Sequence, residues 1–171
     1  MLKRYNRIFG IIILLQLANA FAEIPLQWKV FTSNNMTWMV SSSGVFSFSA
    51  LSRSIKTVTI DEARNVDTIS DGVEYEGYLY LSTNAGIYQL DMNSQSCERI
   101  PLLNDTIIIG KIGSNMDYIW LATSNTLYRF DKLGREWINY KLPETNKVIM
   151  GIFSNDDEVF CSTDGAVYKF T

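Results

Sequence analysis

The residues of this chain that could do chemistry are its carboxylates, because the sequence contains no histidine. Without an imidazole there is no Ser-His-Asp or Cys-His site, no histidine-ligated zinc or iron, and no histidine acid–base chemistry. The densest acidic run, Asn155 to Glu158, lacks the glycine and distal glutamate of an EF-hand loop. We interpret it as a solvated turn. We therefore expect no catalytic residue, no metal and no cofactor.

Two cysteines, Cys97 and Cys161, are the other reactive side chains, and their separation does not match a metal-ligand spacing. They occupy different positions in repeats that are not neighbours. We expect two buried thiols rather than a disulfide.

Four segments of the chain align without a gap, beginning at Trp38, Tyr80, Trp120 and Phe160, at intervals of 42, 40 and 40 residues. They read WMVSSSGVFSF, YLSTNAGIYQL, WLATSNTLYRF and FCSTDGAVYKF. Each half of a copy alternates with period two, which predicts strands with one buried face. The polar residues between the halves favour tight hairpins. The repeat cores are residues 36–48, 78–90, 118–130 and 158–170.

Further strands flank each core. Segments before the cores predict inner strands at Val66–Ser70, Thr106–Ile112 and Lys147–Phe153, and Gln27–Thr32 could hold the same place in the first copy. Segments after the cores predict outer strands at Cys97–Ile100 and Trp137–Tyr140. Four antiparallel strands every ~40 residues is the period of a β-propeller blade. The predicted fold is all-β and propeller-like, with about four blades.

Two arrangements of the ring remain open. Trp28 and Phe31 have the same three-residue offset as Trp137 and Tyr140. The N-terminal segment could therefore be the outer strand of the last copy and close a four-bladed ring. Alternatively it belongs to the first copy, and the blades form an incomplete ring that a second copy would complete as a homodimer.

The strings LYLSTNAGIYQLD, from Leu79 to Asp91, and IWLATSNTLYRFD, from Ile119 to Asp131, resemble the two-component regulator propeller repeat. The resemblance covers essentially the whole mature chain as four blades. Ser82, Ala122, Ser162 and Val40 stand where that family usually has glycine, and Thr126 and Ala166 replace its second glycine. In that family the propeller is the extracytoplasmic sensor of a receptor with a membrane helix and a kinase. Neither follows here, so receptor signalling is not implied.

The first 22 residues have the order of a secretory signal peptide. Lys3, Arg4 and Arg7 precede an apolar run from Ile8 to Leu17, and small residues follow up to Ala22, where we expect cleavage. The apolar stretch is shorter than the ~20 residues of a spanning helix, so no stable membrane span is expected after cleavage. The predicted domain is residues 23–171, secreted or periplasmic.

Charge excludes some partners of the mature domain. The signal holds three of the fifteen Lys and Arg and none of the eighteen Asp and Glu, which leaves a net charge of −6. No basic cluster remains, so nucleic acid and anionic lipid are not expected as partners.

The candidate binding surface consists of the hairpin tips, which vary between copies while the strands do not. These residues are Ser42, Ser43, Asn84, Ala85, Ser124, Asn125, Asp164 and Gly165. Small, polar tips suit a protein or a glycan, so the predicted function is a non-catalytic extracytoplasmic binding module. The alternatives are a carboxylate-dependent glycan hydrolase or lyase, and a remnant of a larger propeller sensor.

The residues that repeat at fixed positions have structural interpretations. Ser41, Thr83, Thr123 and Thr163 are expected to bond the adjacent hairpin backbone. Trp38, Tyr80, Trp120 and Phe160 are expected to form core between blades rather than a sugar platform.

Overall fold

A computed structural model describes residues 28–33, 35–60, 66–102, 110–123, 126–143, 147–155 and 158–170. The predicted signal peptide and its cleavage point lie outside these residues. The described part of the chain contains strands and turns and no helix, and its fifteen strands form four antiparallel sheets. The predicted all-β, propeller-like fold of about four blades is confirmed.

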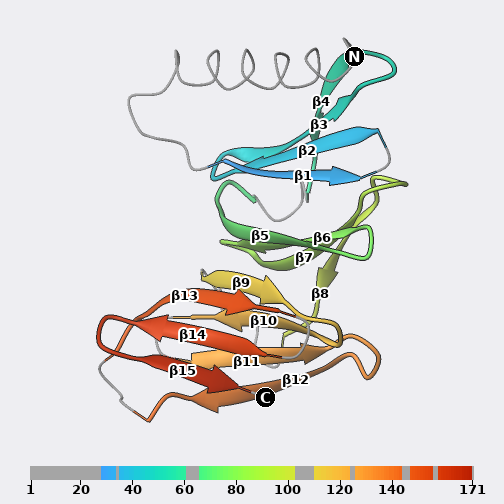
Figure 1. Cartoon of the computed structure of the whole chain (residues 1–171). Helices are drawn as coiled ribbons and strands as arrows, with labels where there is room; N and C mark the ends of the chain where they lie inside the picture. The colour runs from blue at the N-terminus through green and yellow to red at the C-terminus, as the bar shows by residue number, and fades with distance from the viewer. Residues whose placement is uncertain are drawn as a thin grey trace, which may run out of the picture.

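The chain builds the sheets one after another, as the colours of Figure 1 show, and each sheet keeps its strands in chain order. Sheet 1 contains β1 (Lys29–Ser33), β2 (Met36–Ser41), β3 (Gly44–Ser49) and β4 (Ser54–Val58). Sheet 2 contains β5 (Ile69–Tyr75), β6 (Tyr78–Thr83), β7 (Gly86–Asp91) and β8 (Cys97–Ile100). Sheet 3 contains β9 (Lys111–Ser114), β10 (Tyr118–Ala122), β11 (Thr126–Asp131) and β12 (Glu136–Lys141). Sheet 4 has three strands, β13 (Ile149–Ser154), β14 (Val159–Thr163) and β15 (Val167–Phe170).

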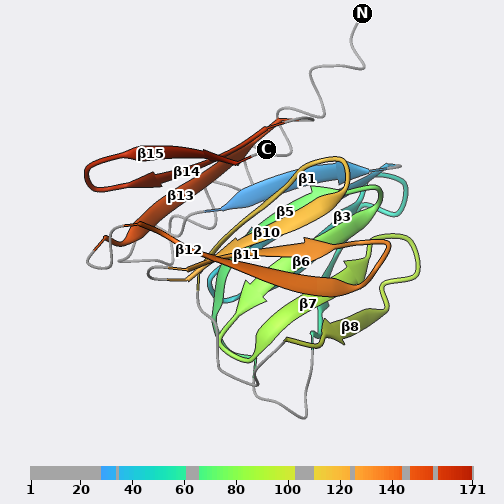
Figure 2. The same ribbon diagram turned by 90° about the horizontal axis from the view of Figure 1, so that it is seen from below.

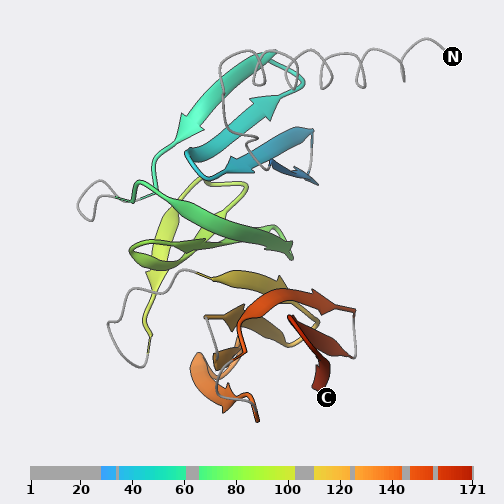
Figure 3. The ribbon, with the colours of Figure 1, turned by 90° about the vertical axis from the view of Figure 1, so that its left-hand side faces the viewer.

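The four sheets follow one another along an arc, with sheet 1 and sheet 4 at its two ends (Figures 2 and 3). The inner strand β9 lies beside both β5 and β13, and β5 also lies beside β2. Among the described residues, no contact of comparable extent joins β1 to β13. The ring of sheets is therefore open between its first and last members.

Three hydrophobic clusters occupy the spaces between successive sheets. Trp38 of sheet 1 packs with Leu79 and Leu81 of sheet 2. Tyr80 of sheet 2 packs in the same way with sheet 3, and Trp120 of sheet 3 with sheet 4. The repeated aromatic residue of sheets 1 to 3 is thus buried core, as predicted, because it faces the next sheet. The same prediction is wrong for Phe160, which is only half-buried because no described sheet follows sheet 4.

The N-terminal segment belongs to the first sheet, where β1 pairs with β2 and Phe31 lies opposite Trp38. The alternative of a four-bladed ring closed by this segment is therefore wrong for this structure. β15 has no outer neighbour among the described strands of sheet 4.

All four inner strands begin later than the sequence indicated, and the difference is largest for β5 and β9. β5 starts at Ile69 and extends to Tyr75, and β9 starts at Lys111. Their register is set by pairing with the repeat cores, since Val73 lies opposite Tyr80 and Gly113 opposite Trp120. The apolar run at 106–112 lies mostly outside the described residues. The predicted outer strands at Cys97–Ile100 and Trp137–Tyr140 are confirmed.

Neither Cys97 nor Cys161 forms a disulfide, as predicted. The predicted burial is correct for Cys161 on β14 and wrong for Cys97, which is half-buried at the start of β8. Burial raises the pKa of the Cys161 thiol to about 11. The two thiols should therefore differ in reactivity, because the thiolate is the nucleophile.

This difference is open to a direct test. In the native protein at pH 8, iodoacetamide should modify Cys97 at least about tenfold faster than Cys161, because one thiol is both buried and less ionised. Peptide mass spectrometry over time measures both rates, and the unfolded protein serves as the control in which the rates converge. Equal rates in the folded protein would contradict the burial of Cys161.

A second prediction concerns the close approach of sheets 3 and 4. A Cβ atom at Gly113 would lie 2.8 Å from Cγ2 of Ile152. Gly113→Ala should lower the free energy of unfolding by about 1–3 kcal/mol, because the neighbouring sheet must move. Gly134→Ala is the matched control, since its Cβ would meet Asp131 Oδ2 at 3.4 Å, an ordinary contact. Urea unfolding measures both, and equal midpoints would contradict this packing.

Candidate functional site

The repeated hydroxyl residue holds each hairpin tip. Thr83 Oγ1 donates to the carbonyl oxygen of Gly86 at 2.8 Å and accepts from the Ala85 N–H at 3.0 Å. Thr123, Thr163 and Ser41 make the corresponding bond across their own turns, at 3.2, 3.2 and 3.5 Å. The structural interpretation of these four hydroxyls is confirmed. Each is used within its own hairpin and fixes the backbone of the tip.

The predicted tip residues differ in exposure and in their hydrogen bonds to the rest of the fold. Ser42, Ser43, Asp164 and Gly165 are exposed. Asn84 and Ala85 are only half-buried, because they bond to other segments of sheet 2. Asn84 Oδ1 accepts from the Thr68 N–H at 3.2 Å, and the Ala85 carbonyl accepts from Arg99 Nε at 3.1 Å. Ser124 and Asn125 lie outside the described residues. A binding role for the tips stays a prediction.

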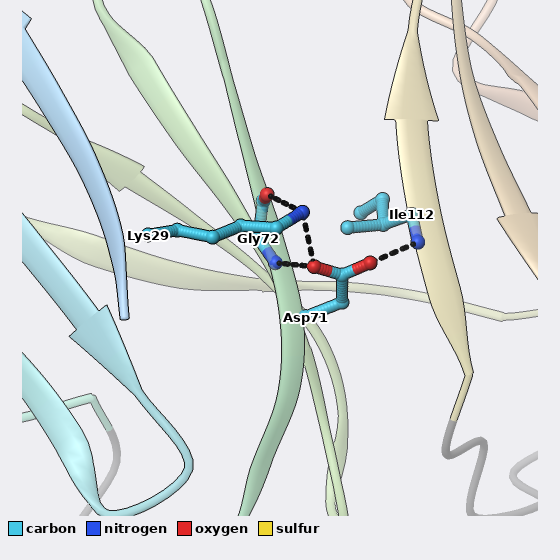
Figure 4. A network of polar contacts seen from close by, with 4 residues as sticks. All are labelled: Lys29, Asp71, Gly72 and Ile112. Carbon is cyan, nitrogen blue, oxygen red and sulfur yellow. Dashed lines mark hydrogen bonds and ion pairs between the residues drawn. The ribbon is translucent and has the colours of Figure 1, made fainter. Parts of the chain in front are cut away.

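A buried carboxylate joins three sheets at the inner strands (Figure 4). Asp71 on β5, whose side chain is 8% exposed, forms an ion pair with Lys29 on β1. Its Oδ1 accepts from the Gly72 N–H at 2.9 Å, and its Oδ2 accepts from the Ile112 N–H of β9 at 3.2 Å. Lys29 Nζ also donates to the Gly72 carbonyl at 3.0 Å. We call these residues the axial network, and their role is to fix sheets 1, 2 and 3 to one another.

Sequence reasoning missed the axial network, although a signal for it exists. Strand pairing places Lys29 opposite Val40 and Asp71 opposite Ser82. Val40 and Ser82 occupy the same position of the repeat, so the two charges are equivalent residues of adjacent copies. Opposite charges at equivalent inner positions could have been found once the register of β5 was known.

A pocket of about 210 Å³ lies where sheet 1 meets the turn between β7 and β8. Its lining is four serine hydroxyls, one ammonium, one amide and one thioether, from Ser47, Ser49, Ser52, Ser54, Lys56, Gln95 and Met36. Ser47 is 1% exposed, and its hydroxyl has no hydrogen-bond partner among the described residues. We call this site the serine pocket. No acidic side chain of the described residues lines it, so the lining they form offers hydroxyls, an amide and one positive charge.

The serine pocket exists because one repeat position is small in the first copy. Ser47 lies opposite Trp38, and the equivalent residues opposite Tyr80 and Trp120 are Gln89 and Arg129. The Arg129 guanidinium fills its space between sheets 3 and 4, with its centre 4.4 Å from the Tyr118 ring and 5.6 Å from the Tyr140 ring. The Ser47 side chain is too short to fill the equivalent space between sheets 1 and 2, so a pocket remains beside sheet 1.

In the part of the chain that the structure describes, the two carboxyl groups with a shifted pKa both have it lowered. Backbone N–H groups of Asn93 and Ser94 lower the pKa of Asp91, which caps the turn after β7. A hydrogen bond and the charge of Lys169 lower the pKa of Glu158. Burial lowers the pKa of Lys132 to about 8. A general acid of the glycosidase type needs the opposite shift, a carboxyl with a raised pKa.

Two further searches of the described residues concern metals and membranes. Within the described ranges, no group of three or more Cys, Asp or Glu residues is placed to hold a metal ion. In the same part of the chain no helix has the length and apolar character needed to cross a bilayer.

Comparison with known proteins defines the fold and not the family. No family model matches the chain, and no curated protein matches it. Two solved structures show the extracellular domain of one B. thetaiotaomicron protein, named a hybrid two component system in one case and a one component system in the other. They match at TM-scores of 0.69 with 14% and 15% identity, over 88% of this chain. This chain spans only 21% and 22% of theirs.

The computationally designed Ika4 protein matches over nearly its whole length. Its TM-score is 0.67 at 9% identity, and the match covers 87% of this chain and 92% of that one. These likenesses support the arrangement of four successive antiparallel sheets.

The axial network generates a prediction that a double-mutant cycle can check. Asp71→Asn should lower the free energy of unfolding by about 1–3 kcal/mol, because the Ile112 and Gly72 N–H groups lose a charged acceptor. Lys29→Met should cost less, since its ammonium is half-exposed. The coupling energy should be about 1 kcal/mol, as for partly exposed ion pairs. Lys141→Met on the exposed side of β12 is the control, and strictly additive Lys29 and Asp71 effects would contradict the network.

Proposed function

We propose that the chain is a non-catalytic extracytoplasmic binding module that recognises a glycan through its end loops, with the serine pocket as the sugar subsite. The observation that carries this proposal is the buried Ser47 hydroxyl, which lines a pocket of about 210 Å³ and has no hydrogen-bond partner among the described residues. Taking about 30 Å³ for a water molecule, that volume equals roughly seven waters, the scale of one monosaccharide.

The lining chemistry favours a hydroxyl-rich ligand. Hydroxyls of Ser47, Ser49 and Ser54 come from adjacent strands of one sheet face, where cross-strand pairing places Ser49 opposite Ser54. A serine hydroxyl both donates and accepts, as a sugar hydroxyl does. Met36 adds an apolar side to the pocket, and Lys56 adds a cation. An acidic sugar therefore uses more of this lining than a neutral one.

The pocket opens among end loops. Ser52 belongs to the turn between β3 and β4, and Gln95 belongs to the turn between β7 and β8. The hairpin tips lie at the opposite ends of the same strands. The module thus has two loop surfaces, one with the serine pocket and one with the tips.

Three observations support an exported, non-catalytic role. The sequence begins with the order of a signal peptide and contains no histidine. Two solved structures that match show the extracellular domain of one protein. The pKa values of Asp91 and Glu158 are lowered, which keeps these carboxylates ionised.

A matched pair of substitutions tests the subsite. Ser47→Gln restores the bulk that Gln89 has at the equivalent position and should abolish sugar binding. Ser43→Gln makes the same chemical change at an exposed hairpin tip and should leave pocket binding unchanged. Isothermal titration and ligand-observed NMR of the exported protein, with glucuronate, galacturonate, glucose and galactose, measure the affinities. We expect a preference for the uronates that Lys56→Gln reduces at least about tenfold, since a charged hydrogen bond is worth ~1.5 kcal/mol or more.

The outcomes separate the two loop surfaces. Binding lost in Ser43→Gln and kept in Ser47→Gln would move the site to the tips. No binding of any sugar, with both variants folded, would remove the glycan proposal. Sequencing the exported protein from its N-terminus, expected at Glu23, tests the compartment separately.

A further inference from the structure

The arc has two unpartnered apolar sheet faces, one at each end, and their residues are known from strand register. On sheet 4 the outward face carries Phe153 opposite Phe160, and Val167 on β15. The one cation at these register positions, Lys169 opposite Phe160, is paired with Glu158. On sheet 1 the outward face carries Val30, Met39, Phe46, Phe48 and Ile55, by the pairing of β1 to β4. No described residue at these register positions of sheet 1 is charged.

Exposure shows that sheet 4 lacks a neighbour that the other sheets have. Val45, Ile87 and Leu127 occupy one repeat position in sheets 1, 2 and 3, and each is 0% exposed because the next sheet covers it. Val167 occupies the same position in sheet 4 and is 67% exposed. Phe153 on the same face is 64% exposed.

Sheet 1 lacks the neighbour on its other side. Met39 is half-buried, whereas its equivalents Leu81, Leu121 and Cys161 are 0% exposed against the preceding sheet. Phe46 and Phe48 are also only half-buried, and Trp28 covers part of this face with its ring centre 5.8 Å from that of Phe46. The two outward faces thus carry the two halves of one type of interface, the one that already forms three times within the chain.

We infer that a second copy of this chain completes the arc, with sheet 4 of each copy packed against sheet 1 of the other. Both contacts are heterologous, and two of them close a twofold ring of eight sheets, within the four to eight blades that propellers use. The uncharged face of sheet 1 fits this occupant, because the repeated interface between sheets is apolar at these positions. Contiguous apolar surface of this kind marks an interface in soluble proteins.

Closure within one chain is the competing geometry. In the structure β1 and β13 do not meet to any comparable extent, and the axial network fixes β1, β5 and β9 to one another. Bringing sheet 4 onto sheet 1 of the same chain would require these inner strands to move. A second copy covers both faces without that change.

Size-exclusion chromatography with light scattering on the exported protein tests the inference. We expect twice the chain mass at micromolar concentration. Val167→Glu on sheet 4 and Ile55→Lys on sheet 1 should each halve the mass, because each puts an unpaired charge into the apolar contact. Leu133→Glu in the turn after β11, where Leu133 is 95% exposed, is the control and should leave the mass unchanged.

Each other outcome overturns the inference. A wild-type monomer at all concentrations would mean that the chain closes on itself or needs no partner. A dimer broken by Val167→Glu and not by Ile55→Lys would mean that two sheet 4 faces pack together. Species larger than the dimer would mean that the arcs do not close. Far-ultraviolet circular dichroism confirms that each variant is folded, and the sugar titrations are independent of this result.

Discussion

The whole structure depends on the need of each sheet to bury two apolar faces. A twisted sheet of four short strands cannot cover either face itself, so it is stable only between neighbours. The repeat covers both faces of a sheet, because it places one aromatic residue toward the next sheet and one aliphatic residue toward the preceding one. Trp38 and Leu81 show this across sheets 1 and 2. Every other feature is either a device that fixes this stacking or a place where it is interrupted.

The interactions that fix each hairpin are local and need only one or two residues each. One threonine or serine closes each hairpin tip, and Asp91 and Asp131 accept two turn N–H groups each at the opposite end of the hairpin. These bonds set the register of the strands without help from other sheets. Stacking between sheets needs different contacts, which are Asp71 reaching from β5 to β1 and β9, and Ser154 bonding the Ser114 carbonyl between β13 and β9.

Sequence could predict the hairpins and the buried aromatic residues because both follow from a pattern within one copy. The aromatic, small residue and hydroxyl before each turn repeat at fixed offsets, so alternation alone assigns the faces. The inner strands were harder, since β5 contains Asp71 and Gly72, which have low strand propensity and depend on contacts from other sheets. The serine pocket was beyond prediction, because a small residue becomes a hollow only when the neighbouring sheet is in place.

The sites with distinctive chemistry are the departures of single copies from the repeat. Strand pairing puts Lys29, Asp71, Lys111 and Gly151 at one equivalent inner position, opposite Val40, Ser82, Ala122 and Ser162. Four identical charges at this position would repel one another. Because the acidic Asp71 follows the basic Lys29, the two side chains form an ion pair instead. A second equivalent position, opposite the repeated aromatic residue, holds Gln89, Arg129 and Lys169 in three copies and Ser47 in the first. The shorter side chain of Ser47 leaves the serine pocket. The positions that are alike in all copies form the scaffold. The pocket and the axial network form where one copy has a different residue at an equivalent position.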